Sequence, residues 1–373
     1  MKLGVLKPLD ARDLRSAIHP DTLGKLLQCE GLEISFEHGL GNGISITDTQ
    51  FSSFGAKPSS RVEIIQNSDY LFIQDVLSHE DMSFIRSGTT LIGIISPFAN
   101  REFIHECAHR GINLVSMEFV PRITRAQKMD VLSSQANLAG YAAVLSAANH
   151  FHSALPMMMT AAGTLKPARV FIIGVGVAGL QAIATAKRLG AKVEAFDTRP
   201  VVEEQVQSLG AKFIKIDLGD TGQTDQGYAK ELTQEQLNKQ RELQAKVCAR
   251  SDIVITTAQV FGRPAPRLID ENTIEQMMPG SVIFDMAVES GGNVAGSVVD
   301  EIVIKNGVKI LGLSHLPSKL PNHASLALSN NFINLFLEFY DREKQSFNVN
   351  LEDEILDSSM LVYKGEIRNK AFK

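Results

Sequence analysis

Residues Arg169–Leu180 read RVFIIGVGVAGL, and they carry the strongest indication of the fold. This stretch opens with an apolar run typical of a buried strand and continues through the glycine-rich turn Gly174–Gly179. A helical pattern over Leu180–Leu189 follows. A second predicted strand, Lys192–Phe196, comes after that helix. A strand, a helix and a further strand in this order predict a βαβ unit, the building block of a parallel sheet.

The same alternation extends in both directions from this unit. Further strands are expected at Lys2–Leu6, Leu32–Phe36, Tyr70–Ile73, Thr90–Ile95, Ile112–Met117, Lys212–Ile216, Ile253–Thr256, Val282–Asp285 and Val308–Leu311. Long helices are expected at Ala126–Ala148 and Leu326–Tyr340, a mobile loop at Gly219–Gly227, and a hairpin-like tail at Phe347–Val362. We therefore expect an α/β fold with two Rossmann-like domains, mainly parallel sheets, and long helices joining them across a cleft. Residues 1–132 with 326–373 should form the N-terminal domain, and residues 133–325 the second.

Composition limits the function classes. The 373 residues carry 37 Lys+Arg against 42 Asp+Glu, a formal charge of −5, which argues against a nucleic-acid binder. No apolar run reaches the roughly 18 residues that span a bilayer, and Met1–Asp13 lacks the apolar core of a secretory signal. Three scattered cysteines (Cys29, Cys107 and Cys248) argue against a disulfide framework. A soluble cytoplasmic enzyme is the expectation.

The turn Gly174–Gly179 matches the pattern GxGxxG, and it lies between a strand and a helix as that pattern requires. Gly174 permits the tight turn, Gly176 lets the backbone approach a pyrophosphate, and Gly179 lets the helix pack closely on the strand. The free N–H groups of the helix start then face the phosphates. The alternative is a glycine-rich turn without a ligand.

Asp197 ends the strand after this helix, close to the position where a carboxylate accepts hydrogen bonds from the adenosine ribose. A carboxylate there repels a 2′-phosphate, so it favours NAD(H) over NADP(H). Arg199 leaves this choice open, because an arginine can pair with that phosphate. It can also be a solvated charge or a clamp on the pyrophosphate.

Two other patterns resemble metal or cofactor sites, but packing explains each of them better. His105–His109 fits HExxH, the zinc-protease pattern, but Phe103, Ile104, Cys107 and Ala108 form the apolar stripe with which a helix covers a sheet. We expect no metal there. Met157–Met159 is expected to fill a core.

A more specific signal is the run Pro121–Gln135, PRITRAQKMDVLSSQ. Together with other segments it resembles the NAD(H)-binding domain of proton-translocating NAD(P) transhydrogenases, the opening portion of their alpha chain. The supporting segments are Asn137–Tyr141, Met157–Gly163, Gly174–Leu180, Gly227–Lys230, Thr256–Ala258, Arg263–Pro266, Val288–Asn293 and Leu351–Glu354. The resemblance covers essentially the whole chain.

The resemblance implies roles for individual residues. The nicotinamide end of NAD(H) would be held by Arg122, Gln127, Asp130 and Ser133, with Ile123 and Thr124 beside them. The adenosine and pyrophosphate would be held by Gly174, Gly176, Val177, Ala178, Gly179, Asp197, Thr198 and Arg199, with further contacts from Gly227, Gln240 and Gln259. Tyr228 would close over the nucleotide. The alternatives are a helix-capping cluster at Asp130 and an exposed loop aromatic at Tyr228.

The same fold is similar to alanine dehydrogenase, and Arg15 fits both families. That family needs a lysine after the strand ending at Ile73 and a histidine after the strand ending at Ile95, where this chain has Gln74-Asp75 and Ser96-Pro97. Reductive amination needs such a general acid/base, whereas direct hydride transfer between two nicotinamides needs positioning. The substitutions therefore favour transhydrogenation.

We expect a chain that passes hydride from bound NADH to NADP⁺ held on a partner beta subunit. Separate membrane-spanning chains would couple the transfer to proton translocation. The resemblance also implies a homodimer attached peripherally to the cytoplasmic face of the bacterial inner membrane. A stand-alone amino-acid or hydroxy-acid dehydrogenase and a non-catalytic NAD(H) sensor are the rival hypotheses.

Overall fold

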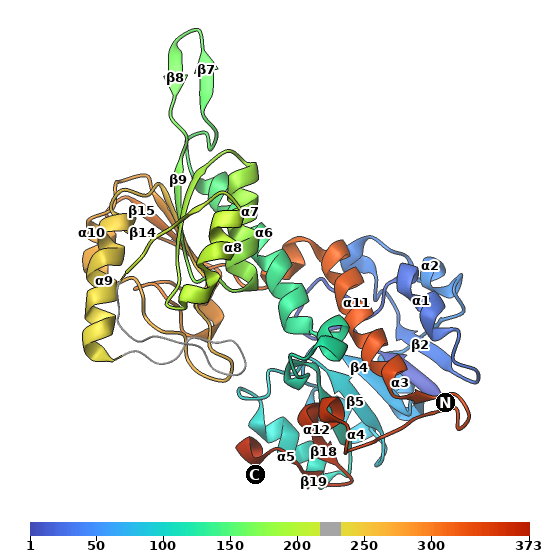
Figure 1. Cartoon of the computed structure of the whole chain (residues 1–373). Helices are drawn as coiled ribbons and strands as arrows, with labels where there is room; N and C mark the ends of the chain where they lie inside the picture. Colours follow the sequence, from blue (N-terminus) through green and yellow to red (C-terminus); the bar gives the residue numbers. More distant parts are fainter. Residues whose placement is uncertain (217–232) are drawn as a thin grey trace. The chain divides into compact units, whose positions relative to one another are not determined.

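The computed structural model describes residues 1–216 and 233–373 (Figure 1). By internal contacts the chain divides into two units, residues 1–135 with 317–373 and residues 136–316. Each unit contains a mainly parallel sheet with helices on both faces, so the expected α/β class is confirmed. The loop expected at Gly219–Gly227 lies outside the described residues.

The first unit is built on an eight-stranded sheet with the order β19-β18-β6-β5-β4-β1-β2-β3. Strands β1 to β6 run parallel, whereas β18 and β19 are antiparallel additions at one edge. The strands are β1 (Lys2–Val5), β2 (Glu33–Glu37), β3 (Lys57–Ser59), β4 (Tyr70–Ile73), β5 (Thr90–Gly93), β6 (Asn113–Ser116), β18 (Met360–Tyr363) and β19 (Glu366–Ile367). The helices are α1 (Pro20–Leu26), α2 (Asp48–Ser52), α3 (Arg61–Asn67), α4 (His79–Phe84), α5 (Arg101–His109), α11 (Pro321–Glu338) and α12 (Glu354–Ser359).

Register explains how this sheet supports two cores. Phe72, Ile92 and Val115 are neighbours across β4, β5 and β6, and they belong to the core shared with α1, α2, α11 and α12. The residue before each of them points to the other face, where α3, α4 and α5 pack. Strands buried on both faces need continuous apolar runs, which is how they appear in the sequence.

The second unit contains a seven-stranded sheet with the order β11-β10-β9-β12-β13-β15-β14, in which only β14 among the described strands is antiparallel. The strands are β9 (Arg169–Ile173), β10 (Lys192–Phe196), β11 (Lys212–Phe213), β12 (Ile253–Thr256), β13 (Val282–Asp285), β14 (Ile302–Lys305) and β15 (Val308–Leu311). Figure 1 shows α7 (Val177–Arg188) and α8 (Glu203–Ser208) on one face and α9 (Gln234–Cys248) and α10 (Glu271–Glu275) on the other. The apolar runs predicted β9, β10, β12, β13 and β15 with their observed bounds.

One long helix was expected over Ala126–Ala148, and this is wrong at its start. A 3₁₀ segment, η3 (Thr124–Met129), comes first, Asp130 has extended backbone, and α6 (Val131–His150) begins after it. The Asp130 carboxylate accepts hydrogen bonds from the backbone N–H and the hydroxyl of Ser133, at 2.9 and 2.6 Å. A carboxylate that satisfies the first N–H groups of a helix starts the helix at that point.

Two further expectations are wrong. Residues 347–362 do not form a hairpin, because α12 lies within them and β18 pairs with β6 of the main sheet. Met157–Met159 fill no core. They lie at the start of a two-stranded hairpin, β7 (Met158–Thr160) and β8 (Gly163–Leu165), which projects from the second unit in Figure 1. Met159 is 84% exposed.

None of the helices within residues 1–216 and 233–373 combines bilayer-spanning length with the apolar character that a membrane span needs. The stripe predicted for α5 is confirmed in part, since Phe103, Ile104 and Cys107 are buried and Ala108 is half-buried. His105 and His109 are exposed on the opposite side of that helix.

Candidate functional site

The glycine turn joins β9 to α7 with the geometry that its sequence predicts. Gly174 has a φ of 98°, in the region that favours glycine. A Cβ on Gly179 would lie 2.0 Å from the carbonyl oxygen of Gly174, so only glycine permits this packing. A Cβ on Gly176 would meet no described atom within 4 Å, so the space beside the first turn of α7 is open among the described residues.

This turn lies where the direction of chain progression across the sheet reverses. Strand β9 pairs with β10 on one side and with β12 on the other, so the loops that follow β9 and β12 diverge at the carboxyl edge. Thr257, just after β12, donates its hydroxyl to the carbonyl of Gly174 at 3.0 Å. Open α/β sheets bind ligands in the crevice at such a switch point.

Asp197 and Arg199 are bound to the turn and to each other. The Asp197 carboxylate accepts the backbone N–H of Val175 at 2.7 Å. Arg199 donates Nε and Nη2 to the two carboxylate oxygens, at 2.8 and 2.7 Å, and Nη2 also reaches the Val175 carbonyl at 3.1 Å. The hydrogen bond to Asp197 raises the pKa of Arg199. Thr198 lies between the two residues in the chain, and the three form the loop after β10.

Helix α6 approaches the glycine turn through Gly140, a residue to which the sequence motifs give no role. A Cβ on Gly140 would lie 2.2 Å from the carbonyl oxygen of Ala178, so α6 contacts the first turn of α7 backbone to backbone. One turn earlier, Asn137 donates to the amide oxygen of Gln181 at 3.3 Å. A glycine in the middle of a long helix pattern is the sequence signal for such a close approach.

Asp285 and Asn293 organise the neighbouring loops from a fully buried position. Asp285, the last residue of β13, accepts N–H groups from Ala287 and Asn293 at 3.0 and 3.2 Å. The Asn293 side chain exchanges hydrogen bonds with the backbone of Ala258, at 3.1 and 2.9 Å. Gln259 follows in the same loop and donates to the Met286 carbonyl at 2.9 Å. The position of Gln259 is therefore set by residues of two adjacent loops.

Gln240 lies on the inner face of α9 together with Gln244, which the sequence did not single out. Both are buried, at 4% and 2% exposure. The Gln240 Oε1 and both amide atoms of Gln244 have no hydrogen-bond partner among the described residues. The same helix face carries Val247 and Cys248, which pack with Phe171 of β9. These amides are already removed from water in the folded chain, so a polar group that binds to them adds hydrogen bonds without further desolvation of the amides.

Residues Arg122–Ser133 lie on the first unit. Ala126 and Met129 are fully buried in its core, and Ile123 packs against that core, whereas Arg122, Thr124 and Gln127 are exposed. Asp130 and Ser133 bond to each other at the start of α6, the capping arrangement that was the alternative for this cluster. Gln127 thus lies on the exposed side of a segment whose other side packs into the core of the first unit.

The structure places these residues in two groups. Arg122, Ile123, Thr124, Gln127, Asp130 and Ser133 lie close along one segment of the first unit. The glycine turn, Asp197, Thr198, Arg199, Gln240 and Gln259 belong to the second unit. Gly227 and Tyr228 lie outside the described residues. Within the described parts of the chain no three His, Cys, Asp or Glu side chains are arranged to hold a metal.

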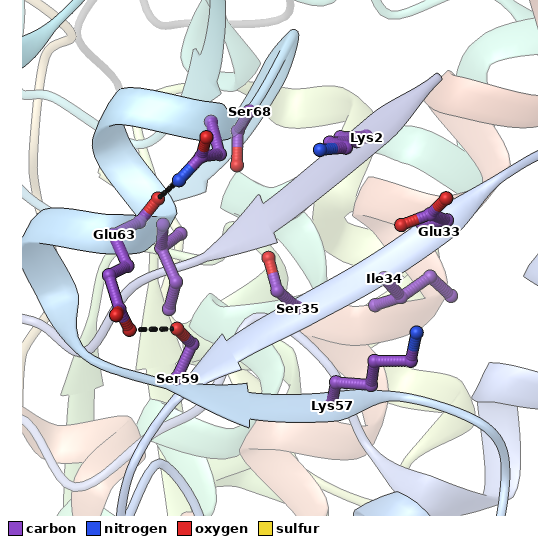
Figure 2. Close-up of a pocket in the computed structure, with 10 residues that line it drawn as sticks. Lys2, Glu33, Ile34, Ser35, Lys57, Ser59, Glu63 and Ser68 are labelled. Carbon is purple, nitrogen blue, oxygen red and sulfur yellow. Dashed lines mark hydrogen bonds between the residues drawn. The ribbon is translucent and has the colours of Figure 1, made fainter.

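A hollow of about 390 Å³ lies elsewhere on the described surface, on the first unit over β1, β2 and β3 (Figure 2). Its lining includes Lys2, Glu33, Ser35 and Lys57, so charges of both signs alternate along it. None of the residues singled out from the sequence lines it. The hollow carries no chemistry that the motifs predict.

Comparison with known proteins agrees with this geometry. The model for the alanine dehydrogenase/PNT N-terminal domain matches residues 4–139, and that for the C-terminal domain matches residues 143–370. A Rhodospirillum rubrum protein, named as one part of NAD(P) transhydrogenase subunit alpha, is 43% identical over 379 aligned positions, which cover 100% of this chain and 98% of that protein. The chain belongs to the alanine dehydrogenase/PNT family, on its transhydrogenase side.

Solved structures of the family show the same fold. The transhydrogenase structure from Sinorhizobium meliloti superposes with a TM-score of 0.89 at 40% identity, covering 98% of this chain and 100% of the other. An L-alanine dehydrogenase superposes with a TM-score of 0.83 at 22% identity, covering 100% and 98%. The second likeness shows the fold alone.

Proposed function

We propose that this chain is the NAD(H)-binding subunit of a proton-translocating NAD(P) transhydrogenase. The observation that carries the proposal is the glycine turn at the switch point of the second sheet, in a chain 43% identical to a transhydrogenase alpha subunit. The open space at Gly176 suits a pyrophosphate, because the first N–H groups of a helix such as α7 have no partner within the helix and can bind an anion. The carboxylate of Asp197 suits the adenosine ribose and favours NAD(H) over NADP(H).

In this proposal Gly174, Gly176, Val177, Ala178 and Gly179 bind the pyrophosphate. Asp197, Thr198 and Arg199 bind the adenosine half, with Gln240, Gln259 and Gly227 as further contacts. Arg122, Ile123, Thr124, Gln127, Asp130 and Ser133 bind the nicotinamide end, and Tyr228 closes over the nucleotide. Asp130 and Ser133 already hold one another, so their part is to present a fixed pair of polar groups to the ribose and carboxamide.

The dinucleotide, when bound, would supply hydride chemistry: C4 of NADH would lose hydrogen with its electron pair to C4 of NADP⁺ on the partner, leaving NAD⁺ and NADPH. The residues of this chain need only bind, orient and exclude water, because no proton is exchanged at the reacting carbons. Gln74 and Ser96 follow β4 and β5 and are neither lysine nor histidine. Gln74 is buried, and its amide has no partner among the described residues.

The proposal includes partners. A separate beta subunit would hold NADP(H), and membrane-spanning chains would couple transfer to proton movement at the cytoplasmic face of the inner membrane. The name of the Rhodospirillum rubrum relative, which marks it as one portion of an alpha subunit, supports a divided complex.

A homodimer is part of the proposal, supported by the projecting hairpin with its exposed Met157, Met158, Met159 and Leu165. We also propose that the N-terminal domain comprises residues 1–132 and 326–373, and that the NAD(H)-binding domain comprises residues 133–325.

The test follows reduction of acetylpyridine-NAD⁺ by NADPH, first with this chain alone and then with an isolated NADP(H)-binding transhydrogenase domain added. Activity only in the mixture is expected. NADH binding without transfer in the mixture would contradict the proposal and favour a sensor. Pyruvate- and ammonia-dependent NADH oxidation by the chain alone would favour a dehydrogenase.

A further inference from the structure

The segment Leu351–Glu354 has no role in the function proposed so far, yet it contacts the segment that carries the nicotinamide-binding residues. Asp353 precedes α12 and accepts the backbone N–H of Ile355 at 2.9 Å. The same carboxylate accepts Nη2 of Arg125 on both oxygens, at 2.7 and 2.8 Å. One side chain therefore starts a helix and holds η3.

A second carboxylate acts on the same segment. Glu338, the last residue of α11, pairs with Arg125 at 3.3 Å and with Lys128 at 2.8 Å. Arg125 and Lys128 are three residues apart, and Gln127 lies between them in the chain. We name Arg125, Lys128, Glu338 and Asp353 the loop anchor. It contains two cations and two carboxylates.

The backbone is held from the same helix. The Asn331 amide of α11 donates to the carbonyl of Lys128 at 2.9 Å, and Asn334 reaches that carbonyl at 3.3 Å. Asn331 also accepts the hydroxyl of Ser134 at 2.6 Å, inside the first turn of α6. The segment between Arg125 and Ser134 is thus fixed at both ends by residues more than 190 positions away in sequence.

The charged side chains of the loop anchor are partly exposed, so the anchor affects the orientation of the segment more than its stability. The side chains of Arg125 and Lys128 are 46% and 50% exposed, and ion pairs at such positions add little to the free energy of unfolding. The core contacts of Ala126 and Met129 supply the stability of the segment instead. A displacement of about 1 Å at a positioning group, by contrast, can slow a reaction by about a hundredfold.

We propose that Asp353 and Glu338 are positioning residues for hydride transfer. Through Arg125 and Lys128 they hold Gln127 and Asp130 in the orientation that transfer requires. This inference rests on the proposed function. It predicts that loss of the anchor slows transfer much more than it weakens NADH binding or the fold.

The test uses Asp353→Asn in the full chain, mixed with the NADP(H)-binding domain. Asparagine still accepts the N–H of Ile355, so α12 is kept, but its charge for Arg125 is lost. We expect the transfer rate at saturating nucleotide to fall by about tenfold or more, with the NADH dissociation constant changed by less than about twofold. Asp357→Asn is the matched control, because it removes the pair with Arg368 from the same helix without touching η3, and its rate is expected to stay unchanged.

A double-substitution cycle separates positioning from a general loss of structure. Arg125→Ala and Asp353→Asn should slow transfer by similar factors, and the double variant should be no slower than the slower single variant. Asp353→Glu should recover part of the rate. Three results would each overturn the inference. They are equal losses of transfer rate and NADH affinity in Asp353→Asn, additive effects of the two substitutions in the double variant, and a transfer rate of Asp353→Asn within about twofold of the parent. Absence of transfer in the parent chain would instead contradict the proposed function.

Discussion

At the scale of single residues, the glycines of the turn make separable contributions. Gly179→Ala would force its Cβ against the Gly174 carbonyl, so we expect a loss of about 3 kcal/mol in the free energy of unfolding together with loss of NADH binding. Gly176→Ala meets open space, so its thermal midpoint should stay unchanged while its NADH affinity falls by at least about tenfold. Thermal unfolding and NADH titration of the two variants measure both quantities. Unchanged affinity in Gly176→Ala would contradict a pyrophosphate at the turn.

The choice between cofactors is also decided by single residues. Asp197→Asn keeps an acceptor for the N–H of Val175 but removes the charge that occupies Arg199. We expect NADH affinity to fall by about tenfold and NADPH affinity to rise by a similar factor, because Arg199 can then pair with a 2′-phosphate. Fluorescence titration with both nucleotides measures this. The double variant Asp197→Asn with Arg199→Ala should not gain NADPH affinity, and a gain there would exclude Arg199 as the phosphate partner.

At the scale of elements, one arginine joins α3 and α4 to β2. Arg61 pairs with Asp81 of α4 through two hydrogen bonds of 3.0 Å and with Glu37 of β2 at 2.8 Å. Burial alone would raise the pKa of Asp81, but its hydrogen bonds and charge interaction with Arg61 outweigh burial, so the pKa lies below the ordinary 3.8. A lowered pKa in the folded state contributes stability above the unfolded pKa, and this stability is lost as the pH falls below about 4.

Asp81→Asn should therefore cost about 2 kcal/mol of unfolding free energy at pH 7 and progressively less below about pH 4. Urea unfolding at several pH values measures the difference between variant and parent. Glu242→Gln, which removes an exposed pair with Lys246, is the control, and we expect it to leave stability unchanged. A cost for Asp81→Asn that is the same at pH 3 and pH 7 would rule out the ionised pair as its source.

At the scale of the whole molecule, the projecting hairpin predicts association with a second copy. Met159 of β7 is 84% exposed, and Met157, just before this strand, is 61% exposed; among the described residues β7 and β8 pair only with each other. Methionine suits a surface that repacks against a partner. Met159→Lys should convert the proposed dimer to monomer at micromolar concentration, as sedimentation velocity would measure. Met278→Lys, at another exposed methionine of 65% exposure, should leave the dimer intact. A dimer that survives Met159→Lys would show that the hairpin is not required.

Local patterns were sufficient for the central strands and for the glycine turn. Strands β9, β12 and β13 lie where continuous apolar runs placed them, because a strand buried on both faces needs such a run. Gly174 has the backbone conformation, and Gly179 the close packing, that GxGxxG predicts, since backbone sterics at a tight turn act over a few residues. The roles of Arg122–Ser133, Gly227 and Tyr228 come from family resemblance and remain predictions.

Other features depend on contacts between residues far apart in the chain. The start of α6, the exposure of Met157–Met159 and the pairing of β18 with β6 could not be deduced from periodicity, which does not say what an element packs against. Asp353 meets Arg125 across 228 positions, and no local pattern marks that pair. The α/β class, the core strands and the dinucleotide motif could be read from the amino-acid order alone, because they follow from apolar periodicity and glycine sterics. What anchors the Arg122–Ser133 segment depends on the folded chain, because charged side chains pair with whatever the fold brings within hydrogen-bonding distance.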